Sequence, residues 1–333
     1  MILVTGGCGY IGSHFILRLL KKGQDIVCLD NLSNSNVNVL LKINDLCSKK
    51  VIFIKGNVGD HDLLIDVFKK YEITAIIHFA GYKSIFESIN FPLKYYKNNI
   101  SETISLLNAM NKAKLKKIIF SSSATVYGEN HALPWHENLK IDLPYSPYAQ
   151  SKFIIEKILQ NMCTRNNNSW SIGILRYFNP IGCHPSGKIG ESLNNNSTNL
   201  IPAIIDVILK KNEKLNIYGG DFNTPDGTGI RDYIHVEDLI SGHEKALDYI
   251  SNSNGYNIWN LGSGTGYSVL EIVKEFERVF NKKIPYDIIN RRDGDLSSYW
   301  ADISKAKREL HWNTKFTLID MVKDILSQIE ILK

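Results

Sequence analysis

Tyr148 and Lys152 are the two side chains whose types and spacing best suit chemistry, because a helix would place them one turn apart on one face. Ser146 can cap that helix, and Pro147 suits its first position. An ammonium beside a phenol favours the phenolate, so we expect the pKa of Tyr148 to be lowered from about 10 towards neutrality. The helix N-terminus would act in the same direction. The pair is therefore a candidate general base.

Ser123 is the third candidate, because an apolar run should deliver it to the same edge of a sheet. The run Ile118–Ser121 leads directly into Ser122 and Ser123. A serine hydroxyl there could hydrogen-bond the substrate hydroxyl whose proton Tyr148 takes. A tyrosine and a lysine four residues apart are common by chance. These side chains therefore predict catalysis only in combination with a cofactor site.

A glycine-rich segment near the N-terminus predicts that cofactor site. The apolar run Ile2–Thr5 leads into Gly6-Gly7-Cys8-Gly9-Tyr10-Ile11-Gly12 and then into an apolar helix. The first glycines allow a tight turn close to a pyrophosphate, Gly12 allows the helix to pack on the strand, and the helix N-terminus offers free amides to the anion. The next run ends in Asp30, whose carboxylate should accept hydrogen bonds from the adenosine ribose and repel a 2′-phosphate. NAD is therefore expected rather than NADP.

The first half of the chain alternates short apolar runs with helical stretches. Runs that are apolar on both faces and separated by helix-length connections indicate a parallel sheet covered on both sides, a doubly wound α/β fold of the Rossmann type. Such a fold binds nucleotides at the carboxyl ends of its strands. The expected strands are Ile2–Thr5, Asp25–Leu29, Val51–Ile54, Ala75–Phe79, Lys117–Ser121 and Ser171–Leu175.

Loops dominate after Phe178, which suggests a second, smaller α/β part. We expect an NAD-binding Rossmann domain over residues 1–176, joined by a return strand near 256–262, and a substrate domain over residues 177–333. The polar tract Asn194–Asn199 precedes the apolar helix Leu200–Leu209, so we interpret the tract as a loop that packs on a ligand. Further helices are expected near Val269–Phe280 and Leu318–Ile331.

Composition excludes several other classes of function. The 39 basic and 34 acidic residues give a net charge of +5, and the basic residues are scattered, so neither nucleic acid nor a membrane surface is an expected partner. The five cysteines form no C-x-x-C pair, which argues against a disulfide framework and a zinc site. The opening residues lack a basic segment followed by a long apolar one, and no stretch approaches the length of a membrane span. We expect a cytoplasmic protein without a metal.

The motifs as a set resemble the extended short-chain dehydrogenase/reductase family over nearly the whole chain. The glycine segment, Asp30-Asn31-Leu32, Phe79-Ala80-Gly81, the Ser123 strand and the Tyr148/Lys152 pair specify only that superfamily. Three later blocks resemble its UDP-glucose 4-epimerases: Leu175-Arg176-Tyr177-Phe178-Asn179-Pro180, Arg231-Asp232-Tyr233-Ile234-His235-Val236 and Arg291-Arg292-Asp293-Gly294-Asp295. The resemblance implies interconversion of UDP-glucose and UDP-galactose by inversion at C4, through a 4-keto sugar, with tightly held NAD. It also implies a homodimer formed through the helices near Leu93–Ala113 and Tyr148–Met162.

The same resemblance implies two sets of site residues, with Ser123 and Tyr148 in both. The residues that would line NAD are Gly6, Gly9, Tyr10, Ile11, Gly12, Asp30, Asn31, Ser35, Asn57, Val58, Phe79, Ala80, Gly81, Lys83, Asn98, Ser123, Tyr148, Lys152 and Phe178. The residues that would hold the UDP-sugar are Ser123, Tyr148, Asn179, Asn199, Leu200, Asn216, Tyr218, Arg231, Arg292, Asp295 and Tyr299. A guanidinium fork matches diphosphate oxygens, which supports the two arginines, although arginines in loops usually form ordinary surface ion pairs.

Two positions need separate interpretation. Asn57 stands where the family usually has an aspartate that faces the adenine amine, so the hydrogen bond there would lack charge assistance and NAD would be held slightly less tightly. Tyr299 would border the space into which the group at the sugar C2 swings, and its bulk predicts poor use of N-acetylated sugars. An ordinary aromatic of the C-terminal core is the alternative for Tyr299.

Other functions stay open to different degrees. Nucleotide-sugar 4,6-dehydratases carry an Asp-Glu pair after the serine strand, and Ala124 and Thr125 stand here instead, which disfavours dehydration. An epimerase of UDP-uronic acids or UDP-pentoses is an alternative, because the contacts to the sugar C6 cannot be identified from the sequence. A sensor that binds NAD without turnover is a third possibility, although such relatives typically lose the tyrosine or the lysine, and both are present.

Overall fold

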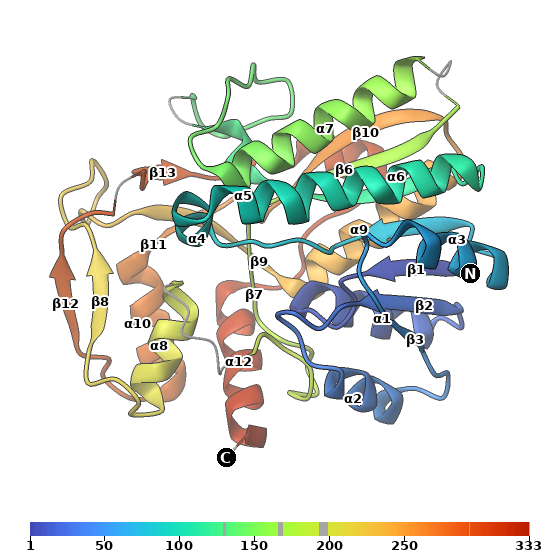
Figure 1. Ribbon diagram of the computed structural model, residues 1–333. Coiled ribbons are helices and arrows are strands. Elements are labelled where there is room, and N and C mark those ends of the chain that lie inside the picture. The colour runs from blue at the N-terminus through green and yellow to red at the C-terminus, as the bar shows by residue number, and fades with distance from the viewer. Residues whose placement is uncertain (129–130, 166–168, 193–198, 293, 333) are drawn as a thin grey trace.

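A parallel seven-stranded sheet forms the centre of the protein (Figure 1). The computed structural model describes residues 1–128, 131–165, 169–192, 199–292 and 294–332. The strand order is β10-β6-β5-β4-β1-β2-β3, and every neighbouring pair is parallel. The strands are β1 (Ile2–Thr5), β2 (Ile26–Asp30), β3 (Ile52–Lys55), β4 (Ala75–His78), β5 (Lys117–Ser123), β6 (Ser171–Tyr177) and β10 (Gly255–Leu261). This topology confirms the doubly wound fold.

The alternation of side chains along each strand divides the core into two layers. On one face, Ile2 and Val4 of β1 pack with α1 (Tyr10–Lys21), α2 (Asn38–Leu46), α9 (Val236–Ser251) and α11 (Ser304–Leu310). On the other face, Leu3 packs with α3 (His61–Lys70), α6 (Glu102–Lys112) and α7 (Pro147–Arg165). The central strands are buried on both faces, which explains why their sequences are mostly apolar.

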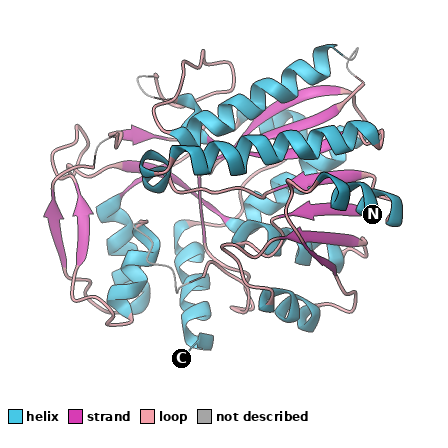
Figure 2. Cartoon of the chain, in the orientation of Figure 1, coloured by secondary structure: helices cyan, strands magenta, loops and turns pink. Residues whose placement is uncertain are grey.

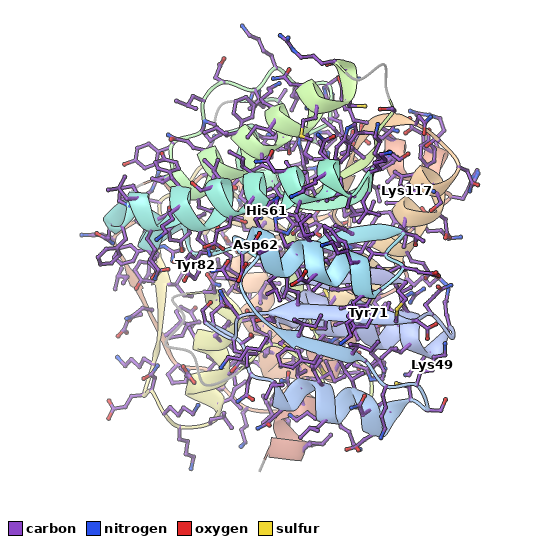
Figure 3. All side chains as sticks on the ribbon, turned by 45° about the vertical axis from the view of Figure 1, so that its right-hand side comes forward. Lys49, His61, Asp62, Tyr71, Tyr82 and Lys117 are labelled. Atoms are coloured by element: carbon purple, nitrogen blue, oxygen red, sulfur yellow. The ribbon has the colours of Figure 1, made fainter. Side chains whose placement is uncertain are left out.

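The start of α3 shows how a capping side chain sets the first residue of a helix. Asp60 caps α3 by accepting a hydrogen bond from the Leu63 amide at 3.0 Å. Figure 3 shows His61 and Asp62 at the start of this helix and Tyr71 just after its end.

Between β4 and β5, the short helices α4 (Ile85–Asn90) and α5 (Pro92–Tyr95) and a π-helical turn (Tyr96–Ser101) lead into α6.

The remaining elements form a smaller body beside the sheet (Figure 2). A four-stranded sheet joins β7 (Asn179–Ile181), β9 (Ile230–His235), β11 (Gly266–Ser268) and β13 (Ser298–Tyr299), and β8 (Leu215–Tyr218) pairs with β12 (Tyr286–Ile289). The helices α8 (Leu200–Ile208), α10 (Val269–Phe280) and α12 (Leu318–Leu332) pack around a third apolar cluster. The division of the chain at residue 176 stays a prediction, since β10, α9 and α11 follow that point and pack with the large sheet.

No described helix is both long and apolar enough to span a bilayer. Residues 194–198 of the polar tract lie outside the described residues.

Candidate active site

A cleft of about 2080 Å³ opens at the carboxyl ends of the strands of the large sheet. Gly6, Asp30, Phe79, Ser123 and Phe178, which end or directly follow five different strands, all line it. The wall opposite belongs to the C-terminal body. Of the site residues expected from the sequence, Asn57 is the exception that does not line this cleft.

The glycine loop has a shape that other residues could not adopt. Gly6 has φ of +68°, and a Cβ atom added to Gly12 would lie 2.4 Å from the Gly6 carbonyl oxygen. Gly9 precedes α1 and provides no side-chain cap for the first amides of the helix. These amides face the cleft, because Tyr10, Ile11 and Gly12 line it. The loop therefore fits a diphosphate, for which it offers a helix N-terminus and close backbone approach.

Asp30 is fixed at the end of β2 by its own neighbours. Its Oδ2 accepts a hydrogen bond from the Cys8 amide at 2.9 Å, and its Oδ1 accepts from the Leu32 amide at 2.9 Å and the Ser35 hydroxyl at 2.8 Å. No basic side chain in the described parts of the chain forms an ion pair with it. The carboxylate is thus held at the cleft with accepting capacity left for a ribose hydroxyl.

Tyr148, Lys152 and Ser123 meet in the buried part of the same cleft. The Lys152 ammonium donates a hydrogen bond to the Ser121 carbonyl at 2.8 Å and lies 6.0 Å from the centre of the Tyr148 ring. The Ser123 hydroxyl oxygen accepts from the Thr125 amide at 3.2 Å and the Thr125 hydroxyl at 3.0 Å. Helix α7 and strand β5 therefore place the three groups together, as expected from their spacing.

The expected lowering of the Tyr148 pKa is wrong for this structure. Burial raises the pKa of the phenol, and a hydrogen bond with Ser123 opposes that rise. Burial also lowers the pKa of Lys152 to about 8, with an opposing contribution from Glu156. The ammonium lies beside the ring and bonds to a backbone carbonyl, so desolvation outweighs its attraction for a phenolate.

A buried ion pair supports the catalytic strand from behind and was not expected from the sequence. The Glu156 carboxylate accepts from Arg176 Nη2 at 2.7 Å and from the Ser122 hydroxyl at 2.5 Å. The Arg176 guanidinium lies 4.7 Å from the centre of the Tyr127 ring. The pair fixes β5 and β6 next to Ser123. An arginine inside an otherwise apolar strand was the signal that could have revealed it.

The arginines of the C-terminal body lie on aromatic rings. The Arg231 guanidinium is 4.7 Å from the Tyr299 ring centre, and that of Arg292 is 4.5 Å from the Tyr218 ring centre. Arg292 also pairs with Asp295 at 3.0 Å. All five line the cleft, so two cations face the space that the glycine loop faces from the other side.

Contacts with two other aromatic rings hold the Tyr299 ring in place. Its ring lies 5.0 Å from the ring of Trp135, with an angle of 6° between the two planes, and 6.1 Å from the ring of Phe178. Asp232 secures the adjoining backbone, because its buried carboxylate accepts from the amides of Ser263 and Ala301 at 2.7 and 3.1 Å. Burial raises the pKa of Asp232 to about 6 against these hydrogen bonds. Tyr299 therefore forms a fixed wall of the cleft. The sequence did not indicate its partner Trp135.

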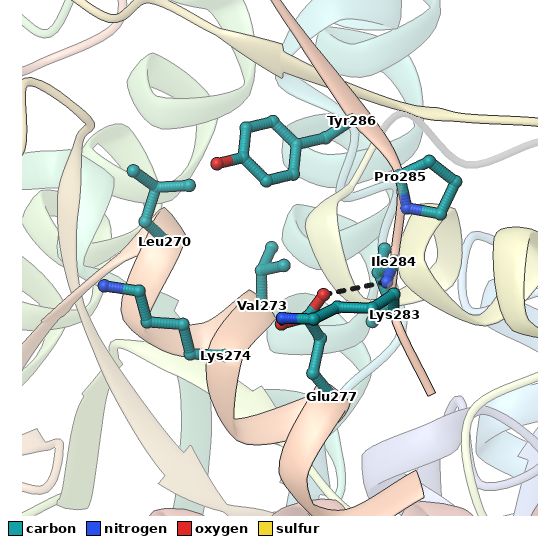
Figure 4. Close-up of a pocket in the computed structure, with 8 residues that line it drawn as sticks. All are labelled: Leu270, Val273, Lys274, Glu277, Lys283, Ile284, Pro285 and Tyr286. Carbon is teal, nitrogen blue, oxygen red and sulfur yellow. Dashed lines mark hydrogen bonds and ion pairs between the residues drawn. The ribbon is translucent and has the colours of Figure 1, made fainter. Parts of the chain in front are cut away.

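A second, smaller pocket lies between α10 and β12 (Figure 4). Its Glu277 accepts from the Ile284 amide at 2.9 Å and pairs with Lys283 at 3.0 Å, so this carboxylate is satisfied by its neighbours. It offers no counterpart of the Tyr148 and Lys152 pair. Among the described residues, no cluster of three histidine, cysteine or acidic side chains is placed to hold a metal ion.

Comparisons with known proteins agree with this geometry. The family model described as GDP-mannose 4,6 dehydratase matches residues 3–325. The UDP-glucose 4-epimerase of Bacillus subtilis (strain 168) is 49% identical over 97% of this chain and 95% of its own length, and that of Yersinia enterocolitica is 48% identical over the same shares. The structure of the Bifidobacterium longum UDP-glucose 4-epimerase in complex with NAD⁺ and UDP superposes with a TM-score of 0.95 at 43% identity, covering 99% of this chain and 98% of that one.

Proposed function

This chain belongs to the UDP-glucose 4-epimerases, within the family described as GDP-mannose 4,6 dehydratase, and from that premise we propose that it interconverts UDP-glucose and UDP-galactose. The observation that carries the proposal is the meeting of Tyr148, Lys152 and Ser123 in one cleft with the glycine loop and two arginines. The enzyme is an isomerase that depends on NAD.

Each group of this cleft has a proposed role. The glycine loop and Asp30 would hold NAD, which when bound would supply hydride acceptance and donation at the sugar C4. Tyr148 takes and returns the proton of the C4 hydroxyl, and Ser123 hydrogen-bonds the same oxygen. Arg231 and Arg292 bind the diphosphate, which leaves the sugar free to present either face.

The family description names a dehydratase, and the cleft argues against that chemistry. Dehydration needs an acid and a base after the serine strand. Ala124 has no ionisable group, and the Thr125 hydroxyl is engaged with Ser123 at 3.0 Å. Inversion without loss of water therefore fits the side chains best.

The test is incubation of the pure protein with UDP-galactose and identification of the product by NMR. We expect UDP-glucose without added NAD, because a reaction with no net redox change does not need to release its cofactor. Denaturation should release NAD⁺ or NADH, measured by absorbance and fluorescence. Protein that binds NAD without converting sugar would instead be a sensor, and protein that requires millimolar NAD would be an ordinary dehydrogenase.

We further propose a cytoplasmic homodimer. None of the five cysteines forms a disulfide, which suits a reducing compartment. Leu93 and Ile104, on the segment from α5 to α6, are 80% and 40% exposed, and an apolar helix face exposed to water suggests a partner. Sedimentation equilibrium should give twice the chain mass, and Leu93→Asp should weaken the dimer. A monomer at micromolar concentration would exclude this interface.

A further inference from the structure

Glu102, the first residue of α6, places a carboxylate in the cleft beyond Asp30. Its Oε1 accepts a hydrogen bond from the Asn57 amide and its Oε2 accepts one from the Asn98 amide, both at 3.2 Å. No ion pair to Glu102 occurs among the described residues. This carboxylate therefore keeps unused acceptor capacity, and its charge is stabilised by two amides and, without an ion pair, by Lys97.

Asn57 supports Glu102. Its side-chain oxygen accepts from the Gly59 amide at 2.7 Å, while its amide group donates to Glu102. The side chain is thereby turned from the cleft, which it does not line. The expectation that Asn57 meets the adenine amine is therefore not supported, and a carboxylate from another element lies beside this position.

The strand order places Glu102 at the base end of a bound dinucleotide. The diphosphate loop follows β1, and Asp30, the ribose carboxylate, ends β2. The next strand outward is β3, so the base must lie past its end, where Gly56 and Val58 line the cleft. Glu102 reaches this place from the start of α6, directly after the π-helical turn that carries Asn98.

We propose that Glu102 determines the specificity of the site for a purine that carries an exocyclic amine. An ionised carboxylate only accepts hydrogen bonds, so it favours the 6-amino group of adenine and opposes a 6-oxo group. This inference rests on the proposed NAD site. The competing role for Glu102 is structural, as a support for Asn57 and Asn98 alone, which would affect every dinucleotide equally.

The experiment compares NAD⁺ with nicotinamide hypoxanthine dinucleotide, in which a carbonyl oxygen replaces the 6-amino group and N1 carries a hydrogen, so that the donor at position 6 is lost. Protein freed of nucleotide is titrated with each by calorimetry, without sugar. Wild-type protein should prefer NAD⁺ by about ten- to hundredfold, the range for a charged hydrogen bond replaced by repulsion. Glu102→Gln should abolish or invert the preference, because its amide can donate to the carbonyl.

Two controls separate the outcomes. Glu72→Gln, at an exposed position that does not line the cleft, should keep the wild-type ratio. Thermal unfolding should show that Glu102→Gln is folded, and Glu102→Ala provides a second variant whose ratio should approach one. An unchanged ratio in the Glu102 variants, or equal affinities in the wild type, would overturn the inference. Binding of neither dinucleotide would overturn the NAD site itself, and the inference with it.

Discussion

Replacing Tyr299 by cysteine tests whether one wall of the cleft selects the sugar. The wild-type ring stacks on Trp135 at 5.0 Å and carries the Arg231 guanidinium at 4.7 Å. A stacked wall cannot move aside, so an acetamido group at C2 would have to overlap it. Overpacking costs about 1–3 kcal/mol, which corresponds to a kcat/KM about 5- to 150-fold lower for UDP-N-acetylglucosamine than for UDP-glucose.

The substitution should open that space at a measurable structural cost. Cysteine lacks the ring, and the vacated volume exceeds that of an acetyl group. The lost stack is worth about 0.5–1.5 kcal/mol and the lost cation–π contact about 0.5–1 kcal/mol, so the free energy of unfolding should fall by about 1–2.5 kcal/mol. Urea unfolding measures this loss.

The assay measures kcat/KM on UDP-glucose and on UDP-N-acetylglucosamine for the wild type, Tyr299→Cys and the control Tyr286→Cys. Tyr286 is exposed and borders the second pocket. Tyr299→Cys should gain activity on the acetylated sugar, and Tyr286→Cys should not. Equal use of both sugars by the wild type, or no gain in Tyr299→Cys, would refute the reasoning and leave Tyr299 as an ordinary core aromatic.

Three other predictions concern the buried groups around Ser123. Tyr148→Phe should keep the fold and NAD while lowering turnover by about 10² to 10⁴, as measured by initial rates; near-full activity would make Ser123 the candidate base. Because the pKa of Lys152 is about 8 and that of Tyr148 is raised, phenolate with ammonium is the minor singly protonated form. The value of kcat/KM should therefore rise with pH up to about 8 and then level off. In Lys152→Met, turnover should be lower and kcat/KM should keep rising above pH 8. A wild-type profile that is flat below pH 8 would contradict this. Arg176→Met leaves the Glu156 carboxylate buried without its partner, so urea unfolding should show a loss of about 3–5 kcal/mol; Arg308→Met, at an exposed ion pair, should show almost none.

Local patterns were sufficient to predict the sheet, the glycine loop and the Tyr148/Lys152 pair, whereas most other residues of the cleft followed only from the family resemblance. Strands β1, β2 and β4 are buried on both faces, so their apolar runs are nearly unbroken. A cluster of glycines directly after a strand has few uses other than binding a phosphate. Spacing also placed Tyr148 and Lys152 together, because a helix has a fixed rise per turn.

The parts that could not be predicted depend on contacts between distant residues. Asn57 is turned by Glu102, 45 positions later, and the wall at Tyr299 depends on Trp135. The direction of the Tyr148 pKa was missed because spacing gives the distance between two charges along a helix and not the desolvation of each.

The position of β10 beside β6 has a consequence for biosynthesis. The edge of β6 that pairs with β10 stays unpaired until residues 255–261 have left the ribosome. By then more than two thirds of the chain has been made. An unpaired, fully buried edge strand invites pairing with other chains. Nascent chains that stall before β10 should therefore be prone to aggregation and dependent on chaperones, and a gene fragment ending at residue 176 should not yield a well-behaved protein.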